Sequence, residues 1–189
     1  MRMRPHNCQR DYKILMLGLD SSGKTTILYK LYSKPLVRLI PNTAFNIEAL
    51  HTPQGEHLTI WDISGQSRVN WQFYVHGNIA LVFVVDSTDY GRVSEAKEAL
   101  WWIFEGHKEE MKGTLMVLVY ANKQDQPNAM TVDEIKDELD VENLPRGRNG
   151  RHRRWHVQGA SALMDVGLWE GVDWLCAQIK DTRNPRLQS

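Results

Sequence analysis

The feature that most constrains the fold is a glycine-rich segment between an apolar run and a helical pattern. Residues 18–25 read Gly-Leu-Asp-Ser-Ser-Gly-Lys-Thr, which fits the pattern G-x-x-x-x-G-K-T of a phosphate-binding loop. The apolar run at 12–17 predicts a buried strand before the loop, and the apolar spacing in 26–32 predicts a helix after it. A loop in this position directs backbone N–H groups at a phosphate. The sequence therefore predicts a site for a nucleoside phosphate.

The residues of this loop have distinct predicted roles. The backbone N–H groups surround the α- and β-phosphates, Lys24 reaches the β- and γ-phosphates, and the Thr25 hydroxyl is a ligand for Mg²⁺. The alternative is a chance glycine turn, which the flanking strand and helix patterns argue against. The predicted nucleotide-binding residues of this region are Gly18, Leu19, Asp20, Ser21, Ser22, Gly23, Lys24, Thr25 and Thr26.

Apolar runs alternate with helical patterns along the rest of the chain, which predicts a sheet with helices on both faces. A turn at Pro53–Glu56 predicts that the second and third strands form a hairpin. The segment Thr131–Glu134 fits the S/T-x-x-E capping box at the start of a helix. Strands are predicted near 12–17, 45–51, 57–63, 79–85, 114–120 and 155–159, and helices at 24–33, 92–106, 131–139 and 168–180.

Length and charge restrict the remaining possibilities. The chain has 189 residues and a formal net charge of zero, so we expect one domain at 11–181, a polar, basic extension at 1–10 and a tail at 182–189. Without a global field, no nucleic acid is expected as a partner, and we expect a monomer. The two cysteines are far apart and no apolar stretch is long enough for a membrane span. We expect a cytoplasmic protein, with peripheral association with endomembranes left open.

A second motif predicts which base is bound. Asn122-Lys123-Gln124-Asp125 follows the buried run at 115–120, and Asn-Lys-x-Asp at the end of a strand is the guanine-reading element of GTP-binding proteins. The Asp125 carboxylate can accept from both N1–H and the N2 amine of guanine, a pair of donors that adenine lacks. The Lys123 stem would lie over the ring. Ser161 and Ala162 fit a third guanine element, in which the Ala162 N–H meets the base oxygen O6.

Between these motifs lies Trp61-Asp62-Ile63-Ser64-Gly65-Gln66. A carboxylate at a strand end can hold Mg²⁺ through water, which suits Asp62. The Gly65 N–H can contact a γ-phosphate, and Gln66 is the candidate catalytic residue that orients the attacking water. The plainer alternatives are a solvated strand end for Asp62 and a surface amide for Gln66.

Taken together, these residues resemble the ADP-ribosylation factor family of small GTPases, including its Arf-like members. The marks are Gly-Leu-Asp-x-x-Gly-Lys-Thr in the loop, Trp61-Asp62, Ala121 to Asp125, and Gly167 to Leu175. The resemblance implies a Ras-like P-loop GTPase fold, with a six-stranded, mostly parallel sheet and one antiparallel hairpin. It also implies Mg²⁺, GTP and GDP as ligands, and effector, exchange-factor and activating proteins as partners.

The family carries an aromatic triad that effectors contact, and the matching positions are Phe45, Trp61 and Tyr74. The alternative is that these rings only cover the edge of the core, as large aromatic side chains often do. Interaction surfaces favour such aromatic residues, so both interpretations stay open.

Several positions depart from the family pattern. Asn42 stands where the family has the threonine that binds Mg²⁺, so Asn42 is an uncertain metal ligand. Ser64 and Ala44 replace glycines, which restricts the backbone in segments that must change conformation. The segment from Gln66 to Trp71 is two residues shorter than the usual pattern.

Two other departures concern membranes. The second residue is Arg2, so a myristoylation glycine is not expected if Met1 is the true start. The loop 146–154 holds five arginines, which gives either a weak contact with an anionic membrane surface or a solvated loop.

We therefore expect an Arf-type GTP/GDP switch that hydrolyses GTP slowly, since no intrinsic arginine finger is evident, with a role in vesicle or membrane trafficking. The alternative is a nucleotide-binding module with impaired switching, a pseudo-GTPase-like scaffold, which Asn42 and Ser64 motivate. An ATP-dependent kinase would require the 122–125 motif to be accidental.

Overall fold

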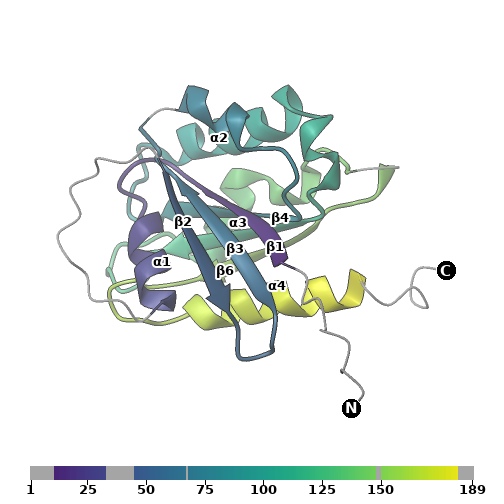
Figure 1. The fold of residues 1–189 in the computed structure, drawn as a ribbon. Helices are drawn as coiled ribbons and strands as arrows, with labels where there is room; N and C mark the ends of the chain where they lie inside the picture. Colours follow the sequence, from purple (N-terminus) through teal and green to yellow (C-terminus); the bar gives the residue numbers. More distant parts are fainter. Residues whose placement is uncertain (1–10, 33–44, 67, 148–149, 183–189) are drawn as a thin grey trace, which may run out of the picture.

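The computed structural model describes residues 11–32, 45–66, 68–147 and 150–182. They form one sheet with helices on both of its faces (Figure 1). The strand order is β2-β3-β1-β4-β5-β6; β2 is antiparallel to β3, and every other neighbouring pair is parallel. The predicted Ras-like architecture is confirmed. The strands are β1 (Asp11–Leu17), β2 (Phe45–His51), β3 (His57–Ile63), β4 (Ala80–Asp86), β5 (Met116–Asn122) and β6 (Arg154–Gly159).

The sheet separates two hydrophobic cores, because successive side chains of a strand point to opposite faces. Leu15 and Leu17 of β1 pack in the core that contains residues of α2 and α3, whereas Ile14 and Met16 pack in the core that contains residues of α1 and α4. Burial on both faces explains why β1, β4 and β5 read as continuous apolar runs. The helices are α1 (Lys24–Leu31), α2 (Val93–Gly106), α3 (Val132–Leu139) and α4 (Leu168–Thr182).

The described residues also form short 3₁₀ helices that the sequence did not predict, namely η1 (Arg68–Phe73), η2 (Glu110–Gly113) and η3 (Val141–Asn143). The predicted fifth strand, 114–120, also begins two residues too early. Thr114 is buried and ends η2 instead, since its N–H donates to the Met111 carbonyl and its hydroxyl to the Asn78 carbonyl. The capping box of α3 is confirmed: the Thr131 hydroxyl accepts from the Glu134 N–H, and the Glu134 carboxylate accepts from the Thr131 N–H.

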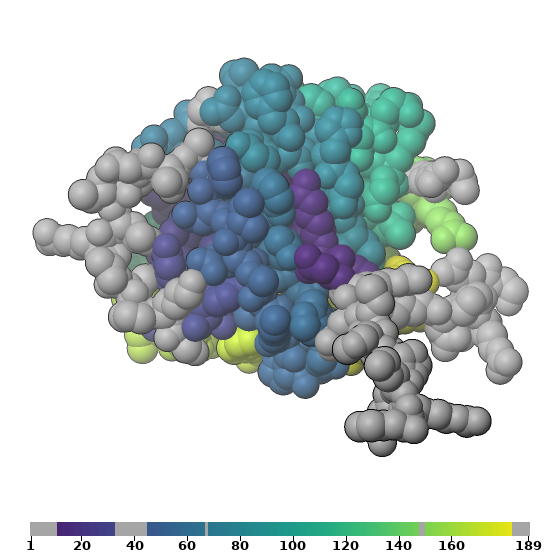
Figure 2. All heavy atoms as spheres, viewed as in Figure 1, coloured from purple at the N-terminus to yellow at the C-terminus, as the bar shows by residue number. Residues whose placement is uncertain are grey.

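The β2–β3 end of the sheet exposes apolar side chains. The β2–β3 hairpin lies at the edge, and on the face seen in Figure 2 its side chains form part of the surface beside those of β1. Phe45 and Ile47 of this hairpin are 41% and 44% exposed.

The loops after β1, β4, β5 and β6 leave from the same edge of the sheet, because these strands are parallel. In open α/β sheets, ligands bind at this carboxyl edge.

Candidate nucleotide-binding site

A cavity of about 300 Å³ lies where the loops after β1, β5 and β6 meet. This volume is within the usual range for a small-molecule site. Three motifs that are far apart in the sequence contribute to it, and Gln126 and Leu163 add to the predicted set. The lining residues are Ser21, Gly23, Thr26, Asn122, Lys123, Asp125, Gln126, Ala162 and Leu163.

The phosphate loop ends at Gly23, which precedes the first residue of α1. Gly23 has φ +96°, and a Cβ atom there would lie 2.2 Å from Asn122 Nδ2. Only glycine combines this backbone conformation with so close an approach. No side chain caps the first turn of α1, so its N–H groups face the loop as donors for an anion.

Lys24 is buried within the loop that it is predicted to serve. Its Nζ donates to the Gly18 carbonyl at 3.0 Å and to the Leu19 carbonyl at 2.7 Å. Burial lowers the pKa of Lys24 to about 8, because the charged form loses its hydration. The Asp62 and Asp20 carboxylates offset part of this loss, and a phosphate group at the loop would add further opposite charge.

The two predicted metal-binding side chains that the structure describes lie in contact. Thr25 Oγ1 donates to Asp62 Oδ2 at 2.8 Å, and Asn46 Nδ2 is 3.5 Å from the same oxygen. Asp62 Oδ1 is buried and has no hydrogen-bond partner among the described residues, and burial raises the pKa of this carboxyl. A buried, unpaired carboxylate oxygen beside a hydroxyl is a donor set that fits Mg²⁺. Asn42 lies outside the described residues.

Asn122 joins two of the three loops. Its Nδ2 donates to the Ser22 carbonyl at 2.8 Å, and its Oδ1 accepts from the Ala162 N–H at 3.0 Å. The side chain is 2% exposed, so both bonds are shielded from water. Asn122 therefore connects the phosphate loop to the 161–162 segment, a role that the motif alone does not indicate. The guanine O6 contact of Ala162 stays a prediction.

Asp125 is held by two neighbours. Its Oδ1 accepts from Ser161 Oγ at 2.6 Å, and its Oδ2 accepts from Gln126 Nε2 at 2.7 Å. These bonds favour the ionised form, so the pKa of the Asp125 carboxyl is lowered. The carboxylate that is predicted to pair with guanine is thus charged, and Ser161 orients it.

The side chain of Lys123 is held by the last residue of β4. Its Nζ forms an ion pair with Asp86, whose other oxygen accepts from the backbone and hydroxyl of Thr88. Gln124 in turn donates to Ser87 Oγ and to the Met130 carbonyl, both at 2.9 Å. The segment after β4 therefore supports the guanine-reading loop. The run Asp-Ser-Thr after an apolar strand is the only signal in the sequence that could have indicated this.

The segment after β3 approaches the phosphate loop closely. A Cβ atom on Gly65 would lie 2.4 Å from the Asp20 nitrogen, so the Gly65 backbone packs on the loop itself. Ser64 is anchored, since its carbonyl accepts from Nε1 of the fully buried Trp71 at 3.0 Å, and its hydroxyl accepts from the Gln66 N–H at 3.3 Å. The Gln66 side chain is exposed, so a catalytic role for it stays a prediction.

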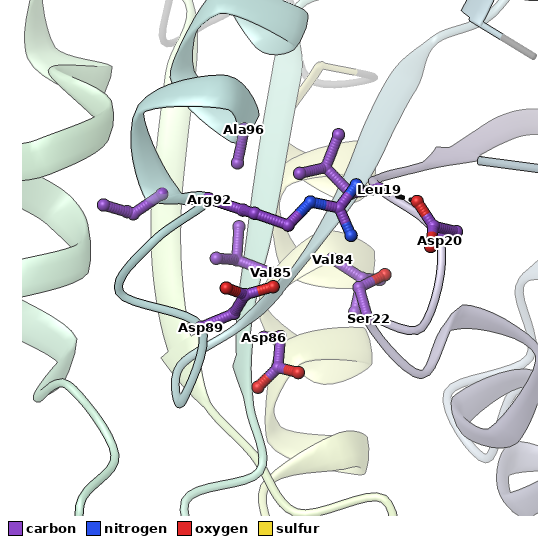
Figure 3. A pocket seen from close by; sticks show the side chains of 10 residues that line it. Leu19, Asp20, Ser22, Val84, Val85, Asp86, Asp89, Arg92 and Ala96 are labelled. Atoms are coloured by element: carbon purple, nitrogen blue, oxygen red, sulfur yellow. Dashed lines mark hydrogen bonds and ion pairs between the residues drawn. The ribbon is translucent and has the colours of Figure 1, made fainter. Parts of the chain in front are cut away.

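Behind the phosphate loop, a second and much smaller cavity of about 10 Å³ separates the loop from the start of α2 (Figure 3). Arg92 extends across it, and its Nη2 lies 2.7 Å from Asp20 Oδ1. The buried Ser22 hydroxyl also lines this cavity and has no partner among the described residues. Arg92 is a residue that the sequence reasoning missed.

The three predicted effector residues form one cluster. The ring centroids of Phe45 and Trp61 are 6.2 Å apart, those of Phe45 and Tyr74 5.7 Å, and those of Trp61 and Tyr74 6.0 Å. Trp61 and Tyr74 pack against the core, and Phe45 is 41% exposed. The cluster thus covers the core edge and also presents a ring to solvent.

In the basic loop, neither a contact with a membrane surface nor a solvated loop, the two expected alternatives, describes Arg153. This side chain is buried over the Phe104 ring and donates to the Thr114 and Met111 carbonyls. Burial lowers its pKa to about 10. Arg154 is paired with Asp181, and Arg148 lies outside the described residues. None of the helices in the described part of the chain is both long and apolar enough to cross a membrane.

Comparison with known proteins agrees with this geometry, since the ADP-ribosylation factor family matches residues 2–179. The chain belongs to the ADP-ribosylation factor family. Among solved structures, the chain is similar to the Arl6 (BBS3) small GTPase from Trypanosoma brucei, which was determined with the nucleotide analogue GppNp. The identity is 27%, the TM-score is 0.75, and the match covers 91% of this chain and 99% of that one. Membership supports guanine-nucleotide binding by this small GTPase.

Proposed function

We propose that this Arf-family protein is a GTP/GDP switch that binds GTP with Mg²⁺, hydrolyses it slowly and acts in vesicle or membrane trafficking. The observation that carries the nucleotide part is the single 300 Å³ cavity shared by the phosphate loop, the 122–125 motif and Ala162. Family membership supports the trafficking role.

Different side chains would bind the base and the phosphates of the nucleotide. Asp125 would bind the guanine N1–H and N2 groups, and Lys123 would cover the ring, since Ser161 and Asp86 already hold these two side chains in place. Lys24 and the first turn of α1 would bind the phosphates. A bound Mg²⁺ would neutralise charge on the phosphate oxygens, with Thr25 and Asp62 as its protein ligands.

The hydrolytic part rests on Gly65 and Gln66. Gly65 packs on the phosphate loop, where its N–H would meet a γ-phosphate, and Gln66 would orient a water for in-line attack. Within the described residues, Arg68 and Arg92, which lie in η1 and at the start of α2, are both engaged in ion pairs. We therefore propose that hydrolysis is slow without a partner protein, and that effector, exchange and activating proteins act on this chain. Phe45, Trp61 and Tyr74 are the proposed effector contacts.

The test is an equilibrium measurement of the affinity for GDP, a non-hydrolysable GTP analogue and ATP, each with Mg²⁺ and with EDTA. We expect tight binding of both guanine nucleotides, weak binding of ATP, and a stronger effect of Mg²⁺ on the GTP analogue. Equal affinity for ATP would contradict guanine recognition. A GTP analogue that binds no better with Mg²⁺ than with EDTA would favour a nucleotide-binding module that does not switch.

A further inference from the structure

A chain of ion pairs runs from the phosphate loop to η1. Arg92 contacts Asp20 of the loop through Nη2 and Glu95 of α2 through Nε, both at 2.7 Å. The second oxygen of Glu95 is 2.6 Å from Nη2 of Arg68, the first residue of η1. Figure 3 shows the first of these contacts, where Arg92 extends from the start of α2 toward the loop. Glu95 therefore bridges two guanidinium groups.

The charges along this series of ion pairs alternate in sign, which makes their electrostatic interaction favourable. The neighbouring guanidinium of Arg92 lowers the pKa of the Asp20 and Glu95 carboxyls, and these carboxylates raise the pKa of Arg92. The side chains of all four residues are only partly exposed, between 33% and 43%. Water screens these ion pairs in part, so the ion pairs contribute modestly to the overall stability of the protein.

A second connection joins the same two regions through the backbone. Gly65 packs directly on Asp20, and the indole N–H of Trp71 in η1 donates to the Ser64 carbonyl. η1 is thus attached at two points. Trp71 binds Ser64, the residue before Gly65, and Arg68 binds Glu95 of α2, the helix whose N-cap residue Arg92 contacts Asp20. Motion of η1 away from α2 would carry the Ser64–Gln66 backbone with it.

We propose that Glu95 and Arg68 are positioning residues that hold the Gly65–Gln66 backbone over the phosphate loop and so increase the affinity for the γ-phosphate of GTP. This inference rests on the proposed function. Neither residue lines the 300 Å³ cavity; both act through the placement of η1. The proposal assigns this placement of η1 to the GTP-bound state, so loss of the ion pair should lower the preference for GTP over GDP.

The experiment compares Arg68→Gln, Glu95→Gln and the double variant with the unchanged protein. Both substitutions remove a charge; Glu95→Gln also keeps the size of the side chain, whereas Arg68→Gln shortens it. Lys97→Gln is the matched control, because Lys97 lies on the same helix and pairs with Asp140 instead. The measured quantity is the ratio of the affinities for a non-hydrolysable GTP analogue and for GDP, both with Mg²⁺, together with the melting temperature of each nucleotide-free protein.

Each single variant is expected to lower this ratio about two- to fivefold, which is the range for a partly exposed ion pair. The affinity for GDP and the melting temperature should stay near those of the Lys97→Gln control. Because both residues act through one contact, the double variant should lose no more than the larger single effect. Arg68→Lys should restore part of the ratio, since it keeps the charge but not the planar head.

The outcomes separate this inference from the proposed function. If the unchanged protein prefers the GTP analogue and the variants keep the same ratio, Glu95 and Arg68 do not position the segment, although the switch stands. Fully additive losses in the double variant would show that the two residues do not act through their contact. If the GTP analogue binds the unchanged protein no better with Mg²⁺ than with EDTA, the proposed function and this inference fall together.

Discussion

The guanine side and the γ-phosphate side of the site are held together by different interactions. On the guanine side, Asn122 makes two hydrogen bonds that are shielded from water, and it ties the phosphate loop to the 161–162 segment. On the γ-phosphate side, the Ser64–Gln66 segment depends on one indole hydrogen bond and on ion pairs of partly exposed side chains. Buried hydrogen bonds resist opening, whereas partly exposed charges exchange easily with water.

The difference assigns separate tasks to the two sides. A region with buried, satisfied bonds keeps its shape whether or not a γ-phosphate is present, so it suits the permanent task of selecting guanine. A region with few buried hydrogen bonds has low local stability, and the segments that move during ligand binding are usually of this kind. Two departures from the family pattern that the structure describes, Ser64 and the short stretch to Trp71, fall on the second side.

The largest expected effect tests guanine selection. Asp125→Asn replaces an acceptor with an amide, which cannot accept from both N1–H and N2 of guanine while it keeps its bond from Ser161. We expect the affinity for GDP to fall about 100-fold or more. Xanthosine diphosphate, which has a carbonyl in place of the N2 amine, should now compete with GDP. Unchanged GDP affinity in a competition assay would show that Asp125 does not read the base.

The next effect tests the guanine-side framework. Asn122→Ala leaves the Ser22 carbonyl and the Ala162 N–H without their partner, so the free energy of unfolding should fall by about 2–4 kcal/mol in a urea titration. The matched control is Asn143→Ala at an exposed asparagine that contacts Asp140, with an expected change under about 0.5 kcal/mol. Similar losses in both variants would remove the contrast between buried and exposed bonds.

A third prediction tests the close approach of Gly65. The Cβ atom in Gly65→Ala would lie 2.4 Å from the Asp20 nitrogen, so the segment must move away from the phosphate loop. We expect affinity for the GTP analogue to fall about tenfold with little change for GDP. Gly113→Ala is the control, because nothing lies within 4 Å of its added Cβ. Equal losses for both nucleotides would place Gly65 outside γ-phosphate recognition.

The smallest effect concerns Lys24, whose pKa of about 8 lies below its usual value. Above this pH the nucleotide-free protein loses the Lys24 proton, and phosphate binding must take it up again. Binding is therefore strongest below pH 8 and weakens as the pH rises through that value. Between pH 7 and about pH 8.5 we expect the GDP affinity to fall about fourfold. Lys24→Met should bind more weakly and lack this pH dependence; the same slope in both proteins would assign the titration elsewhere.

Sequence reasoning could place the guanine side because its motifs follow strands. The loop after β1 and the segment Asn122 to Asp125 at the end of β5 each follow an apolar run, and Ser161 follows the predicted strand at 155–159. Parallel strands bring these ends to one edge. The position of each motif at the end of a strand therefore predicts that the three motifs lie together in the fold. The family resemblance supplied the aromatic cluster of Phe45, Trp61 and Tyr74, which the structure brings together.

The γ-phosphate side was harder to predict because its contacts have no periodic signal. Arg92 and Asp20 are 72 residues apart in the sequence, and arginine and glutamate at the start of a helix are typical of a solvated surface. Arg153 shows the same difficulty, since it lies in a run of arginines but its guanidinium packs on Phe104. Which charged side chains pair or become buried depends on how the elements pack, and that information is not present in local spacing.

The central claim is that the two sides respond differently to the γ-phosphate, and hydrogen–deuterium exchange tests it most directly. The protein is compared when loaded with GDP and with a non-hydrolysable GTP analogue, both with Mg²⁺. We predict slower exchange in peptides that cover Ser64–Gln66 and η1 in the GTP-analogue form, and equal exchange in both forms for peptides that cover 119–125 and 157–162. Identical exchange around Ser64–Gln66 and η1 in the two forms would contradict the account.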